Sequence, residues 1–411
     1  MQLSKWPRPL TVGIGVTMLI GYGTLYYPLA ILGPEIAEER GWSQSFVFGI
    51  FSITLLLSAF VASISGRMLD RFGGRAVLMA GSLCAAATLA GLSLVTTKTE
   101  FAIAMFLLQA GGCMALYEAG FAALTAIHGR DARMPITHVT LIAGFASTVF
   151  WPLIHWLLGF MDWREICLVL AAVNLVVALP IHAALPRPRR ARKAGAVLGE
   201  AEAIAPVAHQ VAILGHGERR PAFVLMAVSF ATSGFLMSAV HTAFFLIMKD
   251  IGRDAALAAL AGAVIGPMQV GARLIEFATG GRIAASLVGV ISNAALLGGI
   301  LLLFVAWFVA GPAPVLAFAV AFGIGQGLAF IARAMLPARL FGTEGYGKVT
   351  GNLATIRLVF TAAGPFVAAV ALDRAGIAAT LGLFAVTALI GLVTAIMLGV
   401  YETRADRAAM R

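Results

Sequence analysis

The sequence is divided into apolar runs of about the length that crosses a lipid bilayer. A helix of about 20 apolar residues covers the roughly 30 Å of hydrocarbon. The runs cover residues 11–36, 43–65, 75–97, 100–126, 136–160, 164–185, 221–248, 254–279, 283–310, 313–339, 347–372 and 376–401. They are too long for barrel strands, and backbone groups in lipid must be hydrogen-bonded within their own segment. The sequence therefore predicts an all-α membrane protein with twelve transmembrane helices.

Charge is scarce and lies mostly in the turns between these runs. Only 12% of the residues are charged and 60% are hydrophobic, whereas a soluble domain carries about 25% charged residues. The formal net charge is +10, but the basic residues do not gather on one face with interleaved aromatic side chains, which argues against nucleic-acid binding. Cys84, Cys113 and Cys167 lie far apart inside apolar runs, so no disulfide, metal site or cofactor is expected.

The distribution of lysine and arginine predicts the orientation. Of the 29 such residues, 20 fall in segments on one side of the predicted membrane, 6 on the other, and 3 within spans. Cytoplasmic loops carry the excess of positive charge. We therefore expect a multi-pass protein of the inner (plasma) membrane with both termini in the cytoplasm.

The chain also divides into two similar halves. Residues 186–220 form the longest connection and are predicted to be a cytoplasmic linker between the six-helix halves 1–185 and 221–411. GGR at 73–75 recurs at 280–282, LLGFMDWREICLVLAAV resembles AVALDRAGIAATLGLFAV, and Gln109 and Gln326 each lie in a glycine-rich helix. The offsets are 207, about 211 and 217 positions, and their similarity indicates a duplication. Repeats of this kind place a binding site at the repeat interface near the midplane.

The stretch GRMLDRFGGR between the second and third runs carries a family resemblance. With twelve helices and a long central loop, it resembles the major facilitator superfamily, whose loop signature is roughly G-x-L-x-D-R-x-G-R-R/K. The matching residues are Gly66, Asp70, Arg71, Gly73 and Arg75, whereas Gly74 stands where an arginine is usual. The resemblance implies that this turn latches the outward-open arrangement. The two glycines allow a tight turn and close helix approach. The arginines of this turn also help to orient the chain in the membrane. Acidic residues contribute little to that orientation, so the presence of Asp70 favours the latch interpretation.

Within the superfamily, the chain more loosely resembles bacterial monocarboxylate-transporter-like and oxalate/formate-exchanger-like members. This resemblance rests on YGTLYYPLAILGPEIAEERGWSQS, on DWRE at the start of the sixth run, and on an arginine in the eighth. The acidic-glycine-tryptophan signature of animal monocarboxylate carriers is absent. The glycine-proline-rich signature of drug/proton antiporters is missing from GFASTVFWPLIHWLLG.

Five ionisable side chains fall well inside the predicted spans: Glu118, Arg273, Glu276, Arg333 and Arg357. Each costs a few kcal/mol or more unless it faces protein or water. Arg273 and Glu276 could pair, since they are three residues apart on one helix face. The resemblance instead implies that Arg273 binds a substrate anion. Arg333 could pair with Glu118 or extend toward the cytoplasm, and Arg357 could contact ligand or pair structurally.

Further candidates lie beside these charges. Glu118 and Glu276 are the candidate proton-coupling residues, because a desolvated carboxyl can take up and release a proton near neutral pH. Tyr117 is next to Glu118, Tyr26 shares a helix face with Tyr22, and His241 lies in the seventh run. We expect these three to contact substrate, with plain packing as the alternative for each.

These features favour a secondary transporter that moves a small organic anion by alternating access, plausibly with protons, as a monomer in the bilayer. The alternative is an exporter of amphipathic drugs or metalloid species. A membrane enzyme is disfavoured, because neither HExxH nor GxSxG occurs. Neither does a nucleotide-binding GxxxxGK[ST] motif, so a solute or proton gradient would supply the energy. A receptor or scaffold on the same fold stays open.

Overall fold

The computed structural model describes residues 9–128, 132–186, 214–279, 283–342 and 346–409. All secondary-structure elements in these ranges are helical. The chain divides into two compact units, Met1–Ile204 and Ala205–Arg411. Most of the predicted linker, and the second GGR at 280–282, lie outside the described residues.

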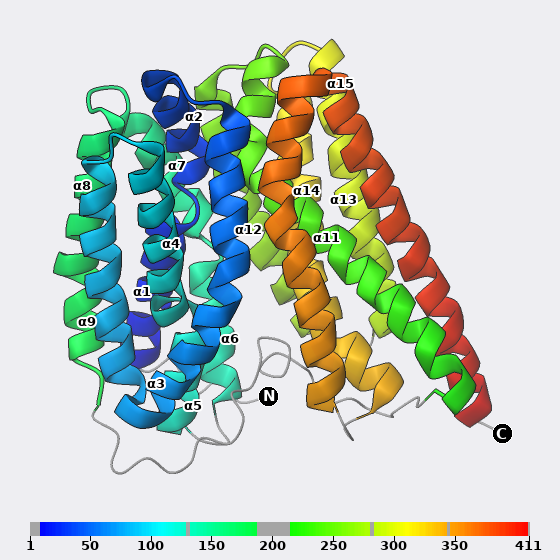
Figure 1. Ribbon diagram of the computed structural model, residues 1–411. Helices are drawn as coiled ribbons and strands as arrows, with labels where there is room; N and C mark the ends of the chain where they lie inside the picture. The colour runs from blue at the N-terminus through cyan, green and yellow to red at the C-terminus, as the bar shows by residue number, and fades with distance from the viewer. Residues whose placement is uncertain (1–8, 129–131, 187–213, 280–282, 343–345, 410–411) are drawn as a thin grey trace. The chain divides into compact units, whose positions relative to one another are not determined.

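Most helices of the first unit are shorter than a membrane span, because several predicted spans are each divided into two or more consecutive helices (Figure 1). They are α1 (Pro9–Leu25), α2 (Leu29–Arg40), α3 (Gln44–Ser93), α4 (Lys98–Ala115), α5 (Tyr117–His128), α6 (Arg133–Ala143), α7 (Ala146–Leu157), α8 (Trp163–Val173), the π-helical turn η2 (Asn174–Ala178) and α9 (Leu179–Ala183).

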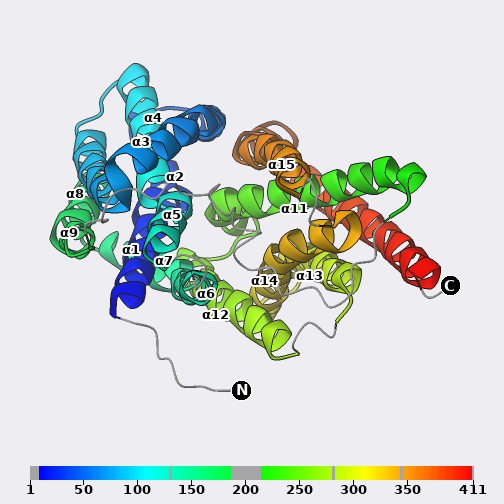
Figure 2. The same ribbon diagram turned by 90° about the horizontal axis from the view of Figure 1, so that it is seen from below.

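The second unit contains longer helices. They are α11 (His216–Asp250), α12 (Ala255–Ala278), α13 (Ala285–Phe308), α14 (Ala313–Phe341) and α15 (Tyr346–Ala409). Within this unit α11 lies along α15, as Figure 1 and the end-on view of Figure 2 both show.

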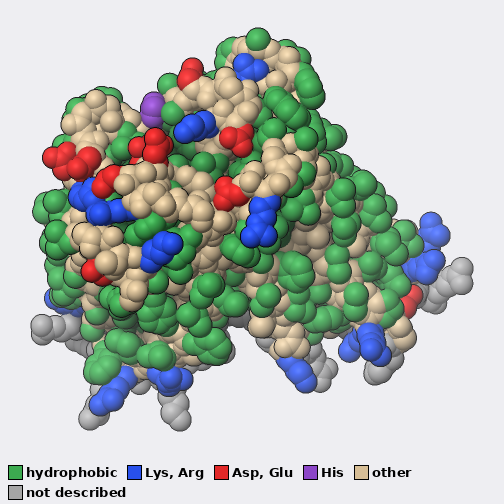
Figure 3. Space-filling view, turned by 45° about the horizontal axis from the view of Figure 1, so that its top comes forward, with side chains coloured by type: hydrophobic (Ala, Val, Ile, Leu, Met, Phe, Trp, Pro, Cys, Tyr) green, Lys and Arg blue, Asp and Glu red, His purple; other side chains and the backbone are tan. Residues whose placement is uncertain are grey.

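The all-α membrane fold is confirmed. Ten helical stretches of the described residues are long and apolar enough to cross a membrane. Two of them, α3 and most of α15, are far longer than a span, and each contains a glycine with non-helical backbone angles, Gly73 (φ 79°) and Gly376 (φ 76°). Gly73 lies between two of the predicted runs, and Gly376 is the first residue of the last run, so ten stretches are consistent with twelve spans. Charged side chains gather at the helix ends, while the sides are mainly hydrophobic (Figure 3).

The first predicted span is broken at Pro28. Residues 26–28 form a turn between α1 and α2, and the amides of Tyr26 and Tyr27 both donate to the carbonyl of Tyr22. Proline has no N–H and clashes with the preceding turn of a helix. The bend expected from the sequence is therefore a full interruption.

The two units repeat the turn after their first span. Gly41 and Gly252 both have left-handed backbone angles, with φ 64° and 73°. Two residues later, Ser43 and Asp254 cap the next helix, each accepting a hydrogen bond from a backbone amide three residues ahead. Both pairs are 211 positions apart, close to the offset found between sequence segments of the halves.

An arginine beside each of these turns makes a further contact that the two units share. Arg40 Nη2 donates to the carbonyl of Val95, beyond the end of α3, and Arg253 Nη2 donates to the carbonyl of Ala306, near the end of α13. Val95 and Ala306 are again 211 positions apart. Since side-chain donors of this kind satisfy carbonyls left open at helix ends, both units use the same cap.

Candidate functional site

Two intramembrane arginines of the second unit meet at one aromatic ring. The guanidinium carbon of Arg273, on α12, lies 4.4 Å from the centroid of the Phe330 ring. That of Arg333, on α14, lies 5.2 Å from the same centroid. A cation over an aromatic face is attracted by the ring quadrupole, so Phe330 holds two positive charges at the contact between these helices.

Both arginines are also anchored within their own helices. Arg273 Nη2 donates to Gln269 Oε1 at 3.5 Å, and Arg333 Nε donates to the carbonyl of Ala329 at 3.1 Å. These partners lie one turn earlier on the same helix. The side chains are therefore held back along α12 and α14 as well as against Phe330.

The structure does not contain the Arg273–Glu276 ion pair that the spacing allowed. Glu276 is 6% exposed, and across the described ranges no ion pair includes its carboxylate. Its Oε1 is buried with no hydrogen-bond partner there. Burying a polar group without a partner is costly, so Glu276 stays a candidate for a functional role.

Arg357 stands apart from the other two arginines. It is half-buried on α15, and the described part of the chain offers its guanidinium no hydrogen bond or ion pair. Its side chain packs on Gly234 of α11, where an added Cβ would lie 2.9 Å from Arg357 Cγ and 2.6 Å from Thr361 Oγ1. The close approach of α11 and α15 therefore depends on a glycine at this point.

In the first unit, Glu118 follows a break in the fourth predicted span. Leu116 has extended backbone angles between α4 and α5, and Glu118 is exposed on the surface of its own unit. Tyr117 is buried between Tyr22, at 4.8 Å between ring centroids, and Phe121, at 5.0 Å. The expected pairing of Glu118 with Arg333 joins residues of different units and stays a prediction.

The remaining aromatic and histidine candidates are packed within their units. Tyr26 is half-buried, with its ring 5.7 Å from that of Phe51. His241 is 4% exposed, with Nδ1 2.7 Å from the carbonyl of Met237 and its ring edge-on to Phe322. Both arrangements match the packing alternative, and their contact with substrate stays a prediction.

The charged residues of the GRMLDRFGGR turn differ in what they contact. Asp70 and Arg71 are exposed, and Arg71 lies 5.1 Å from the ring centroid of Phe72. Arg75 is half-buried and donates from Nη1 to the carbonyl of Leu185 at 3.2 Å, which ties the loop to the end of the sixth span. One of the three expected latch charges thus has a structural role within the unit.

The glycines of this turn also divide their roles. Gly73 adopts the positive φ that separates the second and third spans. An added Cβ at Gly66 would meet nothing within 4 Å in the structure, whereas one at Gly74 would lie 2.5 Å from Ala123 Cβ. The close helix approach is therefore made by Gly74, which explains why the usual arginine is absent from this position.

Two charged clusters were missed by the sequence analysis. The Glu39 carboxylate accepts hydrogen bonds from both Nη atoms of Arg164, at 2.6 and 2.7 Å, and from the indole N–H of Trp163. These bonds join α2 to the start of α8. The sequence could have suggested this contact, because Glu39 and Arg164 carry opposite charges and both lie at ends of predicted spans on the outer side.

The second missed cluster is more deeply buried. Glu402, 2% exposed on α15, accepts from Arg339 Nε of α14 at 3.0 Å and from the backbone N–H of Ser286 at the start of α13 at 2.9 Å. Arg339 Nη2 also donates to Asp406. Arg339 and Glu402 are 63 positions apart in the sequence, so no local spacing could reveal their contact.

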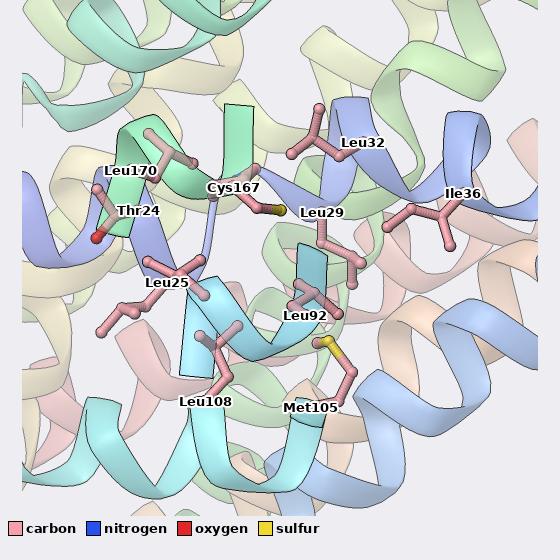
Figure 4. A pocket seen from close by; sticks show the side chains of 12 residues that line it. Thr24, Leu25, Leu29, Leu32, Ile36, Leu92, Met105, Leu108, Cys167 and Leu170 are labelled. Atoms are coloured by element: carbon pink, nitrogen blue, oxygen red, sulfur yellow. The ribbon is translucent and has the colours of Figure 1, made fainter. Parts of the chain in front are cut away.

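A small cavity lies beside the break in helix one, within the first unit (Figure 4). Leu25, Leu29, Leu170 and Cys167 line it together with Thr24 and other apolar side chains. None of the residues that line this cavity carries a formal charge. It is therefore unsuited to hold an anion and is separate from the arginine sites.

Comparison with known proteins places these sites in context. A family model described as Major Facilitator Superfamily matches residues 14–351. Monocarboxylate transporter 13 is 24% identical in Bos taurus and 25% in Rattus norvegicus, over 237 residues that are 58% of this chain and 51% of each relative. Multidrug resistance protein MdtH of Aeromonas salmonicida (strain A449) is 25% identical over 180 residues, 43% of both chains. The chain thus spans about half the length of the curated relatives it matches.

Proposed function

The chain belongs to the Major Facilitator Superfamily, and from this premise we propose that it transports a small organic anion, such as a monocarboxylate, by alternating access coupled to protons. Membership makes it a multi-pass membrane transporter of a small molecule. The anionic substrate, the proton coupling and the mechanism are proposals that the charged residues support.

The observation that carries the anionic substrate is the balance of charge inside the spans of the second unit. Arg273, Arg333 and Arg357 lie inside the predicted spans of this unit, together with one acid, Glu276. The other buried acid of α15, Glu402, lies just beyond the last predicted span and is paired with Arg339. Charges at such depth are rare and mark ligand or ion pathways, and guanidinium groups bind carboxylates through paired hydrogen bonds. Relatives named as monocarboxylate transporters agree with this substrate class.

The remaining parts of the proposal follow the sequence. Glu118 and Glu276 are proposed to bind the proton, with Tyr26, Tyr117 and His241 near the substrate. The GRMLDRFGGR turn is proposed to latch one state, and 186–220 to link two six-helix halves in the cytoplasm, where both termini would lie. The membrane would be the inner (plasma) membrane, and the protein would act as a monomer.

Uptake into liposomes tests this function. Purified full-length protein in proteoliposomes should accumulate at least one of acetate, glycolate, formate or oxalate, and an inward proton gradient should increase the uptake. Protein-free liposomes are the control. No uptake of any of these carboxylates, with or without a pH step, would contradict organic-anion transport.

A second candidate is an exporter of amphipathic drugs or metalloid species, which the similarity to the multidrug resistance protein MdtH supports. Expression in a sensitive host would then confer resistance, and Arg273→Ala would leave that resistance unchanged. Resistance together with absent carboxylate uptake would favour this function over the first.

A further inference from the structure

We propose that α2, the part of the first predicted span beyond Pro28, is a hinged segment that Glu39 holds against α8 and that swings away from α8 during transport. The turn at residues 26–28 is the pivot. The small apolar cavity that both helices line opens toward the predicted outer side when α2 swings. The hinge belongs to the first unit alone, whereas its part in transport rests on the proposed function.

The pivot is an interruption between two helices. Residues 26–28 form a turn, the amide of Tyr27 donates to the carbonyl of Tyr22 five residues earlier, and Pro28 has no N–H to donate. The helical pattern of hydrogen bonds is therefore broken at this point. Hinges are short segments of this kind, which absorb changes in backbone angles while the elements on either side move as rigid bodies.

The end of α1, just before the pivot, is fixed to the sixth predicted span. Asn174 Nδ2, in η2, donates to Thr24 Oγ1 at 3.0 Å, and both side chains are at most 2% exposed. Breaking a buried hydrogen bond is costly, because no water replaces the lost partner. A movement of the first span therefore begins after Thr24, which is where the turn lies.

The outer end of α2 is held by bonds that water can replace. The Glu39 carboxylate accepts hydrogen bonds from both Nη atoms of Arg164, at 2.6 and 2.7 Å, and from the indole N–H of Trp163. The Glu39 side chain is 43% exposed. Exposed ion pairs contribute little to stability, so this attachment can open and close while the unit stays folded.

Between these two attachments, α2 and α8 are not closely packed. Both helices line the small cavity shown in Figure 4, α8 with Cys167 and α2 with Leu29, Leu32 and Ile36. Protein interiors are otherwise densely filled, so fewer apolar contacts are lost here when α2 swings. Cys167 is 1% exposed and lies about 6 Å along α8 from its start at Trp163. Its thiol therefore reaches outer water when the cavity opens.

In the described second unit, neither the break nor the attachment has a counterpart. The position 211 residues after Pro28 is Ala239, inside the continuous helix α11. The position 211 residues after Glu39 is Asp250, and no ion pair of the described residues includes it. The backbone contact of Arg40, by contrast, recurs in the second unit and belongs to the shared fold. The break and the attachment thus occur together in one unit, as expected of a single device.

Labelling of Cys167 by N-ethylmaleimide in the purified full-length protein measures the swing without any substrate. Peptide mass spectrometry separates Cys167 from the other two free cysteines, Cys84 and Cys113. Glu39→Ala removes the attachment and should raise the labelling rate about three- to fivefold. Glu38→Ala, which removes an exposed acid one residue earlier on α2, should leave the rate unchanged.

Pro28→Ala tests the pivot, because alanine restores an N–H through which α1 and α2 can join in one helix. Added to Glu39→Ala, it should return the labelling rate to within about twofold of the wild-type rate. Alone, it should slow carboxylate uptake into proteoliposomes about fivefold or more. Pro34→Ala is the matched control, since Pro34 lies inside α2 and away from the turn, and it should change neither quantity.

Unchanged Cys167 labelling in Glu39→Ala, or an equal rise in Glu38→Ala, overturns the hinge and leaves organic-anion transport standing. An equal rise in Glu402→Ala, a substitution in the second unit, would mean exposure by global unfolding and also overturns the hinge. Wild-type uptake in Pro28→Ala overturns the part of the hinge in transport. If the wild type takes up none of the four carboxylates, the proposed function fails, and the labelling rates still decide the hinge.

Discussion

At the scale of single residues, burial separates the two candidate proton sites. Glu276 is 6% exposed, and its Oε1 has no hydrogen-bond partner among described residues, whereas Glu118 is exposed on its unit. Of the two acids, only Glu276 is enclosed by the surrounding side chains, and burying a charge in this way is costly. Glu276 is therefore the stronger candidate for a carboxyl whose charge changes during transport.

Replacing Glu276 by glutamine should uncouple transport from protons. The amide keeps the shape of the side chain but cannot ionise, so uptake of a carboxylate that rises several-fold in mildly acidic medium for the wild type should become nearly independent of pH in Glu276→Gln. Initial uptake rates across a pH series in proteoliposomes measure this. Glu38→Gln, an exposed acid of α2, is the control. If the dependence survives in Glu276→Gln and is lost in Glu118→Gln, Glu118 is the proton site.

Residue-level predictions reached the charged positions but not their partners. The sequence located Arg273, Arg333 and Arg357 inside spans, because charge stands out in apolar runs. It could not show that Phe330 lies between the first two, or that Arg357 packs on Gly234. The contacts of Arg273 with Phe330 and of Arg357 with Gly234 join residues far apart in the chain, and periodicity carries no information about them. Only Phe330 and Arg333, three residues apart on α14, could have been placed together from their spacing.

At the scale of helices, two charged clusters join neighbouring helices, and the acids at their centres differ greatly in how deeply they are buried. Glu402 connects α15 to α14 and α13 from a position that is 2% exposed. Glu39 connects α2 to α8, but its side chain is 43% exposed. Water screens an exposed ion pair, while removing one member of a buried pair leaves the other charge uncompensated.

Glu402→Ala should therefore destabilise the protein much more than Glu39→Ala. The loss of the buried carboxylate is expected to cost about 3 kcal/mol, since Arg339 and the Ser286 N–H lose their acceptor. The exposed Glu39 should cost about 1 kcal/mol or less. Thermal unfolding of both variants in detergent measures the difference. Equal melting temperatures would show that the Glu402 cluster contributes no more than a surface pair.

The helices themselves were largely predictable, and their interruptions only in part. Apolar length located the spans, and Pro28 indicated a bend in the first. The break at Leu116 and the π-helical turn at Asn174–Ala178 carry no proline. Asn174 there donates to Thr24 Oγ1 of α1, a tertiary hydrogen bond that local propensity cannot anticipate.

At the scale of the whole molecule, the repeated contacts within the two units support a duplicated transporter. The same left-handed glycine and helix cap recur 211 positions apart, as at Gly41 and Gly252, and so do the carbonyls that accept from the neighbouring arginines, which are themselves 213 positions apart. The sequence indicated this offset from short matches only. Their structural counterparts are stronger support, because each is a specific contact rather than a shared residue type.

Substituting Asp70 can separate a role in the transport cycle from a role in folding. It is exposed, and the described part of the chain gives it no hydrogen bond or ion pair, unlike Arg75, which bonds the Leu185 carbonyl. Asp70→Asn should therefore leave substrate affinity and melting temperature close to wild type while slowing uptake by about tenfold, because a latch changes the rate of interconversion between states. Binding by calorimetry and uptake by proteoliposomes measure the two separately.

Arg67→Gln supplies the comparison, since it removes an exposed charge from the same turn. Uptake near the wild-type rate in Arg67→Gln, with slow uptake in Asp70→Asn, would assign the effect to the aspartate rather than to loop charge. Wild-type uptake in Asp70→Asn would mean that this turn only orients the chain. Loss of binding in parallel with uptake would instead mean that Asp70 maintains the folded first unit, which its exposure argues against.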